Sequence, residues 1–306
     1  MEPAGLRLQG RRTVSDTDKK ISLVLGSGGA RGLAHIGIIR YLEESGYRIE
    51  SISGCSMGAL IGGIHAAGKL DEYEKWVLDI DKLDIFGLLD FSFGRTGLVK
   101  GDKLMKKLKE MIGETEIEDL PISFTAVAAD IVREREVWFS KGPLYSAIRA
   151  SISLPLFFTP YKHKGVNLID GGLFNPVPIA PTYSDMTDMT IAVNLTGFHD
   201  HEIEQNGPVP SSEENGMASF SEKIKSFMTR FVPNEPEEGD DWDYFYVASQ
   251  SFDAVQGVIA RQKLAAHPPD VLIEIPRNAC GILEFDRAQE MIDLGYRKAK
   301  DTLGSL

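Results

Sequence analysis

The chain has 306 residues, and its 33 Lys and Arg against 45 Asp and Glu give a formal net charge of −12. The acidic balance argues against a general nucleic-acid binder, which needs basic surface to displace counterions. No apolar run reaches the ~18 residues that span a bilayer, and the polar N-terminus lacks the apolar core of a signal peptide. Cys55 and Cys280 lie too far apart for a metal-ligand spacing, and two cysteines make no disulfide scaffold. We therefore expect a cytoplasmic globular protein.

Residues 1–19 have the composition of a disordered tail, and residues 20–306 are expected to form one folded domain. Apolar stretches predict strands at 21–25, 48–53, 122–129, 136–139, 166–169, 190–195 and 271–275. Helical spacing predicts helices from Gly32 to about Ser45 and at 57–67, 103–112, 244–266 and 283–300, the third with Asp102 as its N-cap. This alternation of strands and helices is typical of an α/β sheet with helices on both faces.

Much of the negative charge is concentrated in one stretch, residues 200–243. It holds twelve acidic and three basic residues, a net of −9, which leaves −3 for the other 262 residues. Its prolines, serines and charges predict a mobile insertion. Within it, residues 220–232 carry apolar side chains at helical spacing. They fit either a short helix packed on the body of the protein or a lid or membrane-surface helix beside an active site.

A G-x-S-x-G sequence, Gly54-Cys-Ser-Met-Gly58, lies between a predicted strand and a predicted helix. This is the context in which the motif presents a nucleophilic serine. The sharp turn holds the serine in a strained conformation, and glycines two residues to either side prevent a collision across the turn. The helix N-terminus also stabilises negative charge near Ser56. The motif therefore predicts Ser56 as a nucleophile, with Met57 beside it.

A glycine-rich turn, Gly26-Ser27-Gly28-Gly29-Ala30-Arg31-Gly32, joins the first strand to the first helix. One interpretation is a dinucleotide-binding loop with Glu50 as the ribose contact, although the third glycine comes one residue late for that motif. The other is an oxyanion hole in which the N–H groups of Gly28 and Gly29 hold the anionic oxygen of a tetrahedral intermediate. The nearby serine turn favours the oxyanion hole.

A serine nucleophile needs a base, and Asp170 is the leading candidate. It ends an apolar strand and precedes Gly171 and Gly172, which allow close approach; a turn-capping Asp is the structural alternative. A histidine base in the Ser…Asp…His order would have to be His199, His201 or His267, and none lies in a supporting motif. The remaining candidates, His35 and His65, fall on predicted helices and suit packing or capping roles better.

Together, the glycine loop at 26–32, the serine turn at 54–58 and Asp170-Gly171-Gly172 resemble the patatin-like phospholipases. This family includes the plant patatins, the cytosolic phospholipase A2 group and the neuropathy target esterase group. The resemblance covers about residues 20–195 and implies a patatin-like three-layer α/β/α sandwich with a mostly parallel central sheet. It also implies a Ser56–Asp170 dyad without histidine, an oxyanion hole at Gly28 and Gly29, and no metal or cofactor. Arg31 would brace the loop, which begins Gly-Ser-Gly-Gly where the family often has Asp-Gly-Gly-Gly.

Residues 147–160 are also similar to a block of that family. The apolar run 154–158 is interrupted by Pro155, which suits a loop better than a strand. It fits either buried core or a groove for an acyl chain, since each buried CH₂ contributes about 0.8 kcal/mol.

Three functions follow as hypotheses. The first is a serine acyl hydrolase that cleaves fatty-acyl esters of phospholipids or lysophospholipids through an acyl-enzyme, with peripheral membrane contact suiting such a substrate. The second is a lipid-sensing regulatory protein with little or no turnover, whose acidic insertion carries the partner contacts. The third is a nucleotide-dependent enzyme that uses the glycine loop.

Overall fold

The computed structural model describes residues 19–80, 84, 101–155, 157–200 and 244–304. The predicted tail and the predicted acidic insertion therefore lie outside the described residues, apart from Lys19 and Asp200 at their edges. Both assignments, and the amphipathic segment at 220–232, remain predictions.

One sheet of eight strands organises the described chain, in the order β5-β6-β3-β2-β1-β7-β8 with β4 beside β3. Its strands are β1 (Lys20–Leu25), β2 (Arg48–Cys55), β3 (Ser123–Asp130), β4 (Arg135–Phe139), β5 (Tyr161–His163), β6 (Val166–Asp170), β7 (Met189–Gly197) and β8 (Val271–Pro276). The five strands from β3 to β8 along this order are parallel, whereas β4, β5 and β6 form antiparallel pairs. The predicted mostly parallel sheet is confirmed.

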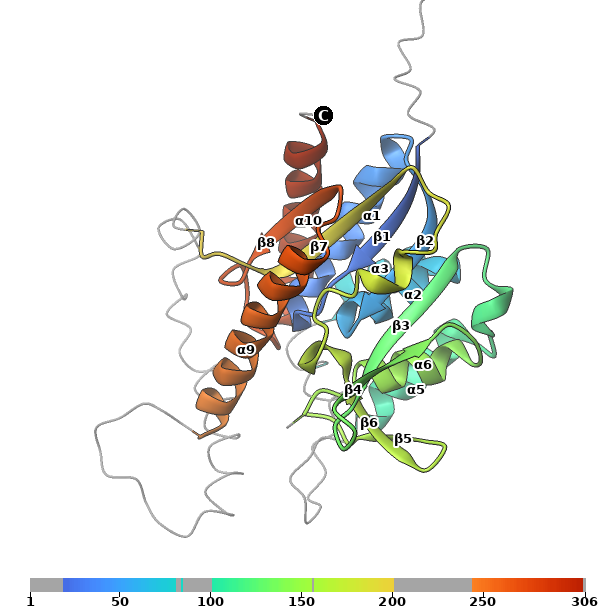
Figure 1. The fold of residues 1–306 in the computed structure, drawn as a ribbon, viewed down its shortest axis with the longest axis vertical. Coiled ribbons are helices and arrows are strands. Elements are labelled where there is room, and N and C mark those ends of the chain that lie inside the picture. The colour runs from blue at the N-terminus through green and yellow to red at the C-terminus, as the bar shows by residue number, and fades with distance from the viewer. Residues whose placement is uncertain (1–18, 81–83, 85–100, 156, 201–243, 305–306) are drawn as a thin grey trace, which may run out of the picture.

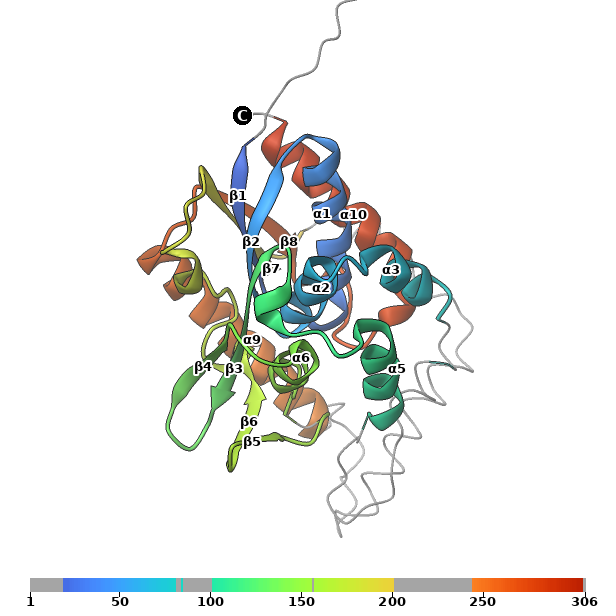
Figure 2. The same ribbon diagram turned by 90° about the vertical axis from the view of Figure 1, so that its right-hand side faces the viewer.

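Helices cover both faces of the sheet, so the three-layer α/β/α architecture is also confirmed. The α-helices are α1 (Ala34–Glu44), α2 (Met57–Ala66), α3 (Leu70–Leu78), α5 (Asp102–Ile112), α6 (Leu144–Ser151), α9 (Tyr244–Ala266) and α10 (Ala288–Leu303). Figures 1 and 2 show α1, α2, α3, α5 and α10 on one side of the strands and α9 on the other.

The alternation of side chains along β1 explains the two unequal layers. Ile21, Leu23 and Leu25 point into the large core under the helical layer that contains α1, α2 and α10. Val24 points to the opposite face, where a small cluster with Val177 and Ala260 lies under α9. Successive strand residues face opposite sides, so one apolar strand supplies both cores.

The structure corrects some of the predicted elements. Helices α3 and α6 and the short strand β5 were not predicted. Asp102 is the first residue of α5 rather than its N-cap, because Gly101 takes the capping position in a left-handed conformation. The last helix begins at Ala288, after a single 3₁₀ turn at Phe285–Arg287, rather than at Leu283. Among the described residues no helix is both long enough and apolar enough to cross a bilayer.

Candidate active site

Two strands that run toward each other bring the predicted nucleophile and the predicted base together. β2 is parallel to β3 and ends where Cys55 pairs with Val127. β6 is antiparallel to β3 and ends where Asp170 pairs with Ala128, the next residue along. The carboxyl ends of β2 and β6 therefore meet at adjacent positions of β3, and Ser56 and Asp170 lie at that junction.

Ser56 has the strained backbone that the motif predicts, with φ 55° and ψ −123°. The glycines of the turn are required by close approach: a Cβ on Gly54 would lie 2.5 Å from the Gly58 carbonyl oxygen, and one on Gly58 would lie 2.0 Å from the Leu25 carbonyl oxygen. Because Ser56 directly precedes helix α2, its side chain lies near the positive end of the helix dipole.

Asp170 is fully buried, and its two carboxylate oxygens differ in their partners. Oδ1 accepts the Gly172 N–H at 2.8 Å and lies 3.8 Å from the Cys55 Sγ donor. Oδ2 meets no donor at standard hydrogen-bond geometry among the described residues. Burial raises the pKa of Asp170 to about 6, while hydrogen bonding from the Ser56 side chain, the Gly172 N–H and the Cys55 thiol lowers it. The oxygen without a standard partner is therefore available to the serine, and catalytic contacts are often loose before substrate binds.

Ser151, which the sequence did not single out, holds the junction from α6. Its hydroxyl donates to the Val127 carbonyl at 2.6 Å and accepts the Ser56 N–H at 2.9 Å. A Cβ on Gly171 would lie 2.2 Å from the same Val127 oxygen, so this glycine lets β6 close against β3. The backbone amide of Ser56 is consequently occupied within the protein.

The N–H groups of the glycine loop divide into occupied and open ones. The Ser27 N–H donates to the Pro176 carbonyl at 2.8 Å, and the Ala30 N–H donates to the Ile282 carbonyl at 2.9 Å. Between them, the N–H groups of Gly28 and Gly29 have no acceptor in the described part of the chain. Gly29 lines the same cavity as Ser56. The two N–H groups without an acceptor are therefore the two that the sequence predicts as the oxyanion hole.

Buried polar side chains fix the shape of this loop. Arg31 is 1% exposed, and its Nε donates to the Gly28 carbonyl at 3.1 Å. Its guanidinium also forms an ion pair with Asp253 of α9, at 2.5 and 3.3 Å, and donates to the Arg277 carbonyl. His35 contacts the Gly26 carbonyl through Nε2 at 2.9 Å, and burial lowers the pKa of this histidine to about 4. Neutral His35 is thus a support for the loop rather than a base at neutral pH.

Helix α9 contributes two residues that sequence reasoning missed, Asp253 and Gln256. The Gln256 Nε2 donates to the Ser27 hydroxyl at 3.2 Å, and a Cβ on Gly172 would lie 2.3 Å from that nitrogen. The two positions are three apart on a predicted helix, which places them on one face. That spacing was the available signal, but nothing in it indicates what the face contacts.

An apolar cavity of about 100 Å³ opens beside Ser56. Besides Gly29, Ser56 and Met57, it is lined by Leu60, Tyr73, Trp76, Val77, Ile80, Leu104, Ile152, Leu154, Phe157, Phe158, Ile282, Leu283 and Phe285. The unpredicted helix α3 supplies three of these side chains, and Ile80 follows it in the chain. A Cβ on Gly32 would lie 2.4 Å from the Met57 Cβ, so this glycine lets the two loops at the cavity approach each other.

Comparison with known proteins identifies the family of the chain. The family model for patatin-like phospholipases matches residues 23–183. The chain belongs to the patatin-like phospholipase family. Membership makes it a carboxylic ester hydrolase of lipids.

The similar proteins include members of the NTE family. The chain is 36% identical to a protein named as an uncharacterized NTE family protein of Mycobacterium bovis, over 98% of this chain and 94% of that one. It is 27% identical to the lysophospholipase nte1 of Neurospora crassa, over 94% of this chain but only 18% of the fungal protein. VipD from Legionella pneumophila has a similar fold, with a TM-score of 0.51, 17% identity, and coverage of 94% of this chain and 67% of VipD.

The competing residues that the structure describes are not placed for the roles that the alternative interpretations need. Glu50 lies near the start of β2, beside Ile21 and Ser22 of β1, at the opposite end of the sheet from the glycine loop, so it is not placed for a ribose contact. His199 is exposed, and His267 packs against Tyr183; His201 lies outside the described residues. The segment around Pro155 is a loop, as predicted, and its Leu154, Phe157 and Phe158 face the cavity.

Proposed function

We propose that Ser56 and Asp170 form the catalytic dyad of a lipid acyl hydrolase. The observation that carries this proposal is the arrangement around Asp170, which interacts with the Ser56 side chain. Its Oδ1 is held by Gly172 and Cys55, while Oδ2 has no standard hydrogen-bond partner among the described residues. A carboxylate anchored through one oxygen keeps the other oriented for proton transfer. A base with a pKa of about 6 is ionised at neutral pH, yet more basic than an ordinary aspartate.

In the first half-reaction, Asp170 accepts the Ser56 hydroxyl proton as the serine oxygen attacks the ester carbonyl. The tetrahedral intermediate collapses when the C–O bond to the leaving alcohol breaks, and protonated Asp170 returns its proton to that alcohol. In the second half-reaction, water attacks the acyl-enzyme and gives its proton to Asp170. The fatty acid leaves as the proton returns to Ser56. One carboxylate serves both steps, and no proton is gained or lost by the enzyme.

The N–H groups of Gly28 and Gly29 would bind the oxyanion that forms in each step. Their neighbours in the loop are already hydrogen-bonded to Pro176 and Ile282, so these two donors remain for substrate. Removing one such donor typically costs about 2.7–4 kcal/mol in transition-state stabilisation. Arg31 would keep the hole in shape by holding the Gly28 carbonyl away from it.

The substrate we propose is a phospholipid or lysophospholipid, with its acyl chain in the cavity beside Ser56. The lining is almost wholly apolar, which suits a hydrocarbon chain and gives no site for a charged acyl group. The relatives named as lysophospholipases support the lysophospholipid in particular.

The test is release of fatty acid, measured by mass spectrometry, from diacyl phospholipids and from the matching lysophospholipids. We expect release by the parent protein and a loss of at least about a thousandfold in Ser56→Ala and Asp170→Asn. Ser184→Ala, an exposed serine at the far end of the sheet, should retain parental turnover. Turnover that persists in folded Ser56→Ala would contradict the proposal. Lipid binding without any release by the parent would favour the lipid-sensing alternative.

A further inference from the structure

Two hairpin turns project side by side from the end of the sheet that carries Ser56. Asp130, the last residue of β3, pairs with Arg135 of β4 on one side and with Leu168 of β6 on the other. The β3–β4 turn (131–134) and the β5–β6 turn (164–165) therefore extend beyond the same end of the sheet (Figures 1 and 2). We call these two turns, with the flanking Arg135 and Lys162, the paired turns.

The first of the paired turns exposes apolar side chains that folding does not explain. Ile131 is 50% exposed and Val132 is 81% exposed. Turns favour Gly, Asn, Asp, Pro and Ser, and β-branched apolar residues there bury nothing. The turn is instead stabilised by Asp130, whose Oδ1 accepts the Arg133 N–H at 3.2 Å. The two apolar residues at the tip are therefore free to contact something outside the chain.

Basic side chains surround this apolar tip. Arg133 and Arg135 follow it in the chain, Lys164 lies in the neighbouring turn, and Lys162 flanks that turn in β5; all four are exposed. Arg133 Nη1 and Arg135 Nε lie 3.1 and 3.6 Å from Asp130 Oδ2. The two arginine side chains nevertheless remain 55% and 62% exposed. The acids of the same surface are the exposed Glu134, the buried Asp130 that pairs with both arginines, and Glu136, which is paired with Lys263. In a chain with a net charge of −12, basic side chains therefore outnumber acidic ones at this end.

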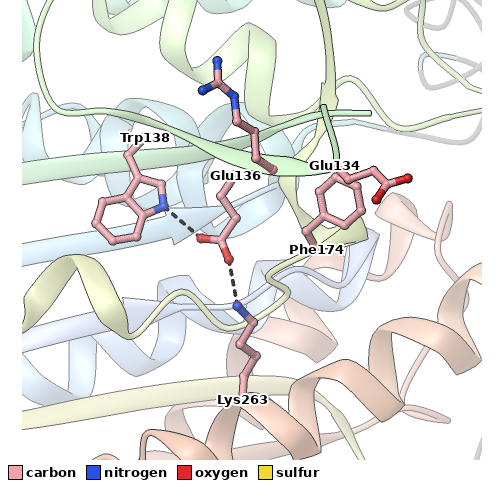
Figure 3. A pocket seen from close by; sticks show the side chains of 6 residues that line it. Glu134, Glu136, Trp138, Phe174 and Lys263 are labelled. Atoms are coloured by element: carbon pink, nitrogen blue, oxygen red, sulfur yellow. Dashed lines mark hydrogen bonds and ion pairs between the residues drawn. The ribbon is translucent and has the colours of Figure 1, made fainter. Parts of the chain in front are cut away.

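An aromatic side chain is fixed at the edge of the same surface. Trp138 is 48% exposed, and its Nε1 donates to Glu136 at 2.9 Å. Glu136 is held in turn by Lys263 of α9 at 2.8 Å and by Asn175 at 2.9 Å. Figure 3 shows Glu136 between Trp138 and Lys263 in an open hollow at the base of the first turn. The indole is thus anchored by its polar edge while much of its ring stays exposed.

The second of the paired turns is continuous with the wall of the apolar cavity. Phe157 and Phe158 line that cavity, and only Thr159 and Pro160 separate them from β5. Arg149 fixes this connection by donating to the Thr159 carbonyl at 3.0 Å. A surface bound by the paired turns would therefore lie next to the segment that forms the cavity.

We propose that the paired turns dock this end of the molecule onto an anionic phospholipid surface. Ile131 and Val132 would enter the interface, and the four basic side chains would contact lipid phosphates. Apolar residues with flanking cations and an interfacial tryptophan are the features of membrane-surface anchors. Because the rest of the chain is acidic, an anionic surface would repel it and attract the basic side chains. The protein would then approach the surface with the paired turns first. The inference rests on the proposed function only in that the bilayer would supply the substrate.

Binding is measured in the Ser56→Ala background, which prevents hydrolysis, with vesicles of phosphatidylcholine containing about one third phosphatidylserine. Cys55 and Cys280 are buried, so a cysteine introduced as Val132→Cys can be labelled selectively with an environment-sensitive fluorophore. We expect its emission to shift to the blue on binding and the affinity to fall with added salt. Met186→Cys is the matched control, since Met186 is 93% exposed near the start of β1 and β7, at the opposite end of the sheet.

Two sets of unlabelled variants complete the test. Lys162→Gln with Lys164→Asn, or Ile131→Ser with Val132→Ser, should weaken vesicle binding about tenfold or more. Lys19→Gln with Lys20→Gln, at the opposite end, should not. With Ser56 intact, all of them should hydrolyse a soluble short-chain ester like the parent. If the parent protein does not hydrolyse the soluble ester, the proposed dyad is contradicted and the docking proposal is not. The docking proposal is overturned if the parent does not bind these vesicles, if the paired-turn variants bind equally well, or if position 186 responds like position 132.

Discussion

The surroundings of Asp170 favour the neutral carboxyl form more than water does, although the group is still ionised at neutral pH. It is fully buried, and only two donors to Oδ1 and the Ser56 side chain offset the loss of water. A pKa of about 6 is the result, and it sets the range of pH in which Asp170 can act as a base.

The pH dependence follows with a definite sign. Below pH 6 Asp170 is protonated and cannot accept the Ser56 proton, so kcat/KM for a soluble ester should rise with pH and reach half its plateau near pH 6. His35, with a pKa of about 4, is neutral across this range and should leave the profile unchanged. The measurement is the initial rate at low substrate concentration across pH 5 to about 8. A flat profile over that range would contradict Asp170 as the base.

Residue patterns predicted the side chains of the proposed site but not how they are held. The glycine loop, the G-x-S-x-G turn and the Asp-Gly-Gly turn could be recognised in the sequence because each needs particular residues for its local backbone conformation. Ser151 and Cys55 contact Ser56 and Asp170 only through the packing of α6 and the end of β2. A lone buried Ser or Cys carries no local signal of such a contact.

At the scale of elements, helix α9 supports the site through its side chains. Its Asp253, Gln256 and Lys263 contact the glycine loop, the Ser27 hydroxyl and Glu136, respectively. The sequence predicted this helix with its observed bounds, since a long helical pattern is a strong local signal. Which partners its polar face meets depends on the sheet order, which no local pattern contains.

The ion pair between Arg31 and Asp253 of α9 should contribute strongly to the stability of the protein. Asp253→Asn leaves the buried Arg31 guanidinium without its anion, and we expect a loss on the order of 3 kcal/mol in the free energy of unfolding. Asp71→Asn is the control, because it removes the acid of an exposed pair with Arg40 and should cost about 0–1 kcal/mol. Urea denaturation measures both. Equal stability of the two variants would show that Arg31 does not depend on α9.

At the scale of the whole molecule, the sandwich has two unequal layers with different roles. The thicker helical layer, through α2, α3 and α5, encloses the apolar cavity beside Ser56. The thinner layer, through α9, supports the glycine loop and leaves the paired turns exposed at one end. The layers and the parallel sheet could be predicted from the alternation of strands and helices.

The meeting of β2 and β6 along β3 could not be predicted in this way. The serine turn and the Asp-Gly-Gly turn, more than a hundred residues apart, converge because Val127 and Ala128 of β3 pair with the ends of β2 and β6. Pairing between distant strands depends on the whole fold. A family resemblance predicted the outcome, but the residues of β3 that produce it carry no motif of their own.

The dyad is tested most directly by covalent labelling of the purified protein with a fluorophosphonate probe, with the adduct mapped by mass spectrometry. We expect a single adduct on Ser56 that is absent in Ser56→Ala and strongly reduced in Asp170→Asn, with both variants folded. Labelling of Ser56 that proceeds equally fast in Asp170→Asn would contradict Asp170 as the base. Labelling at another serine, with Ser56 unmodified, would contradict the site itself.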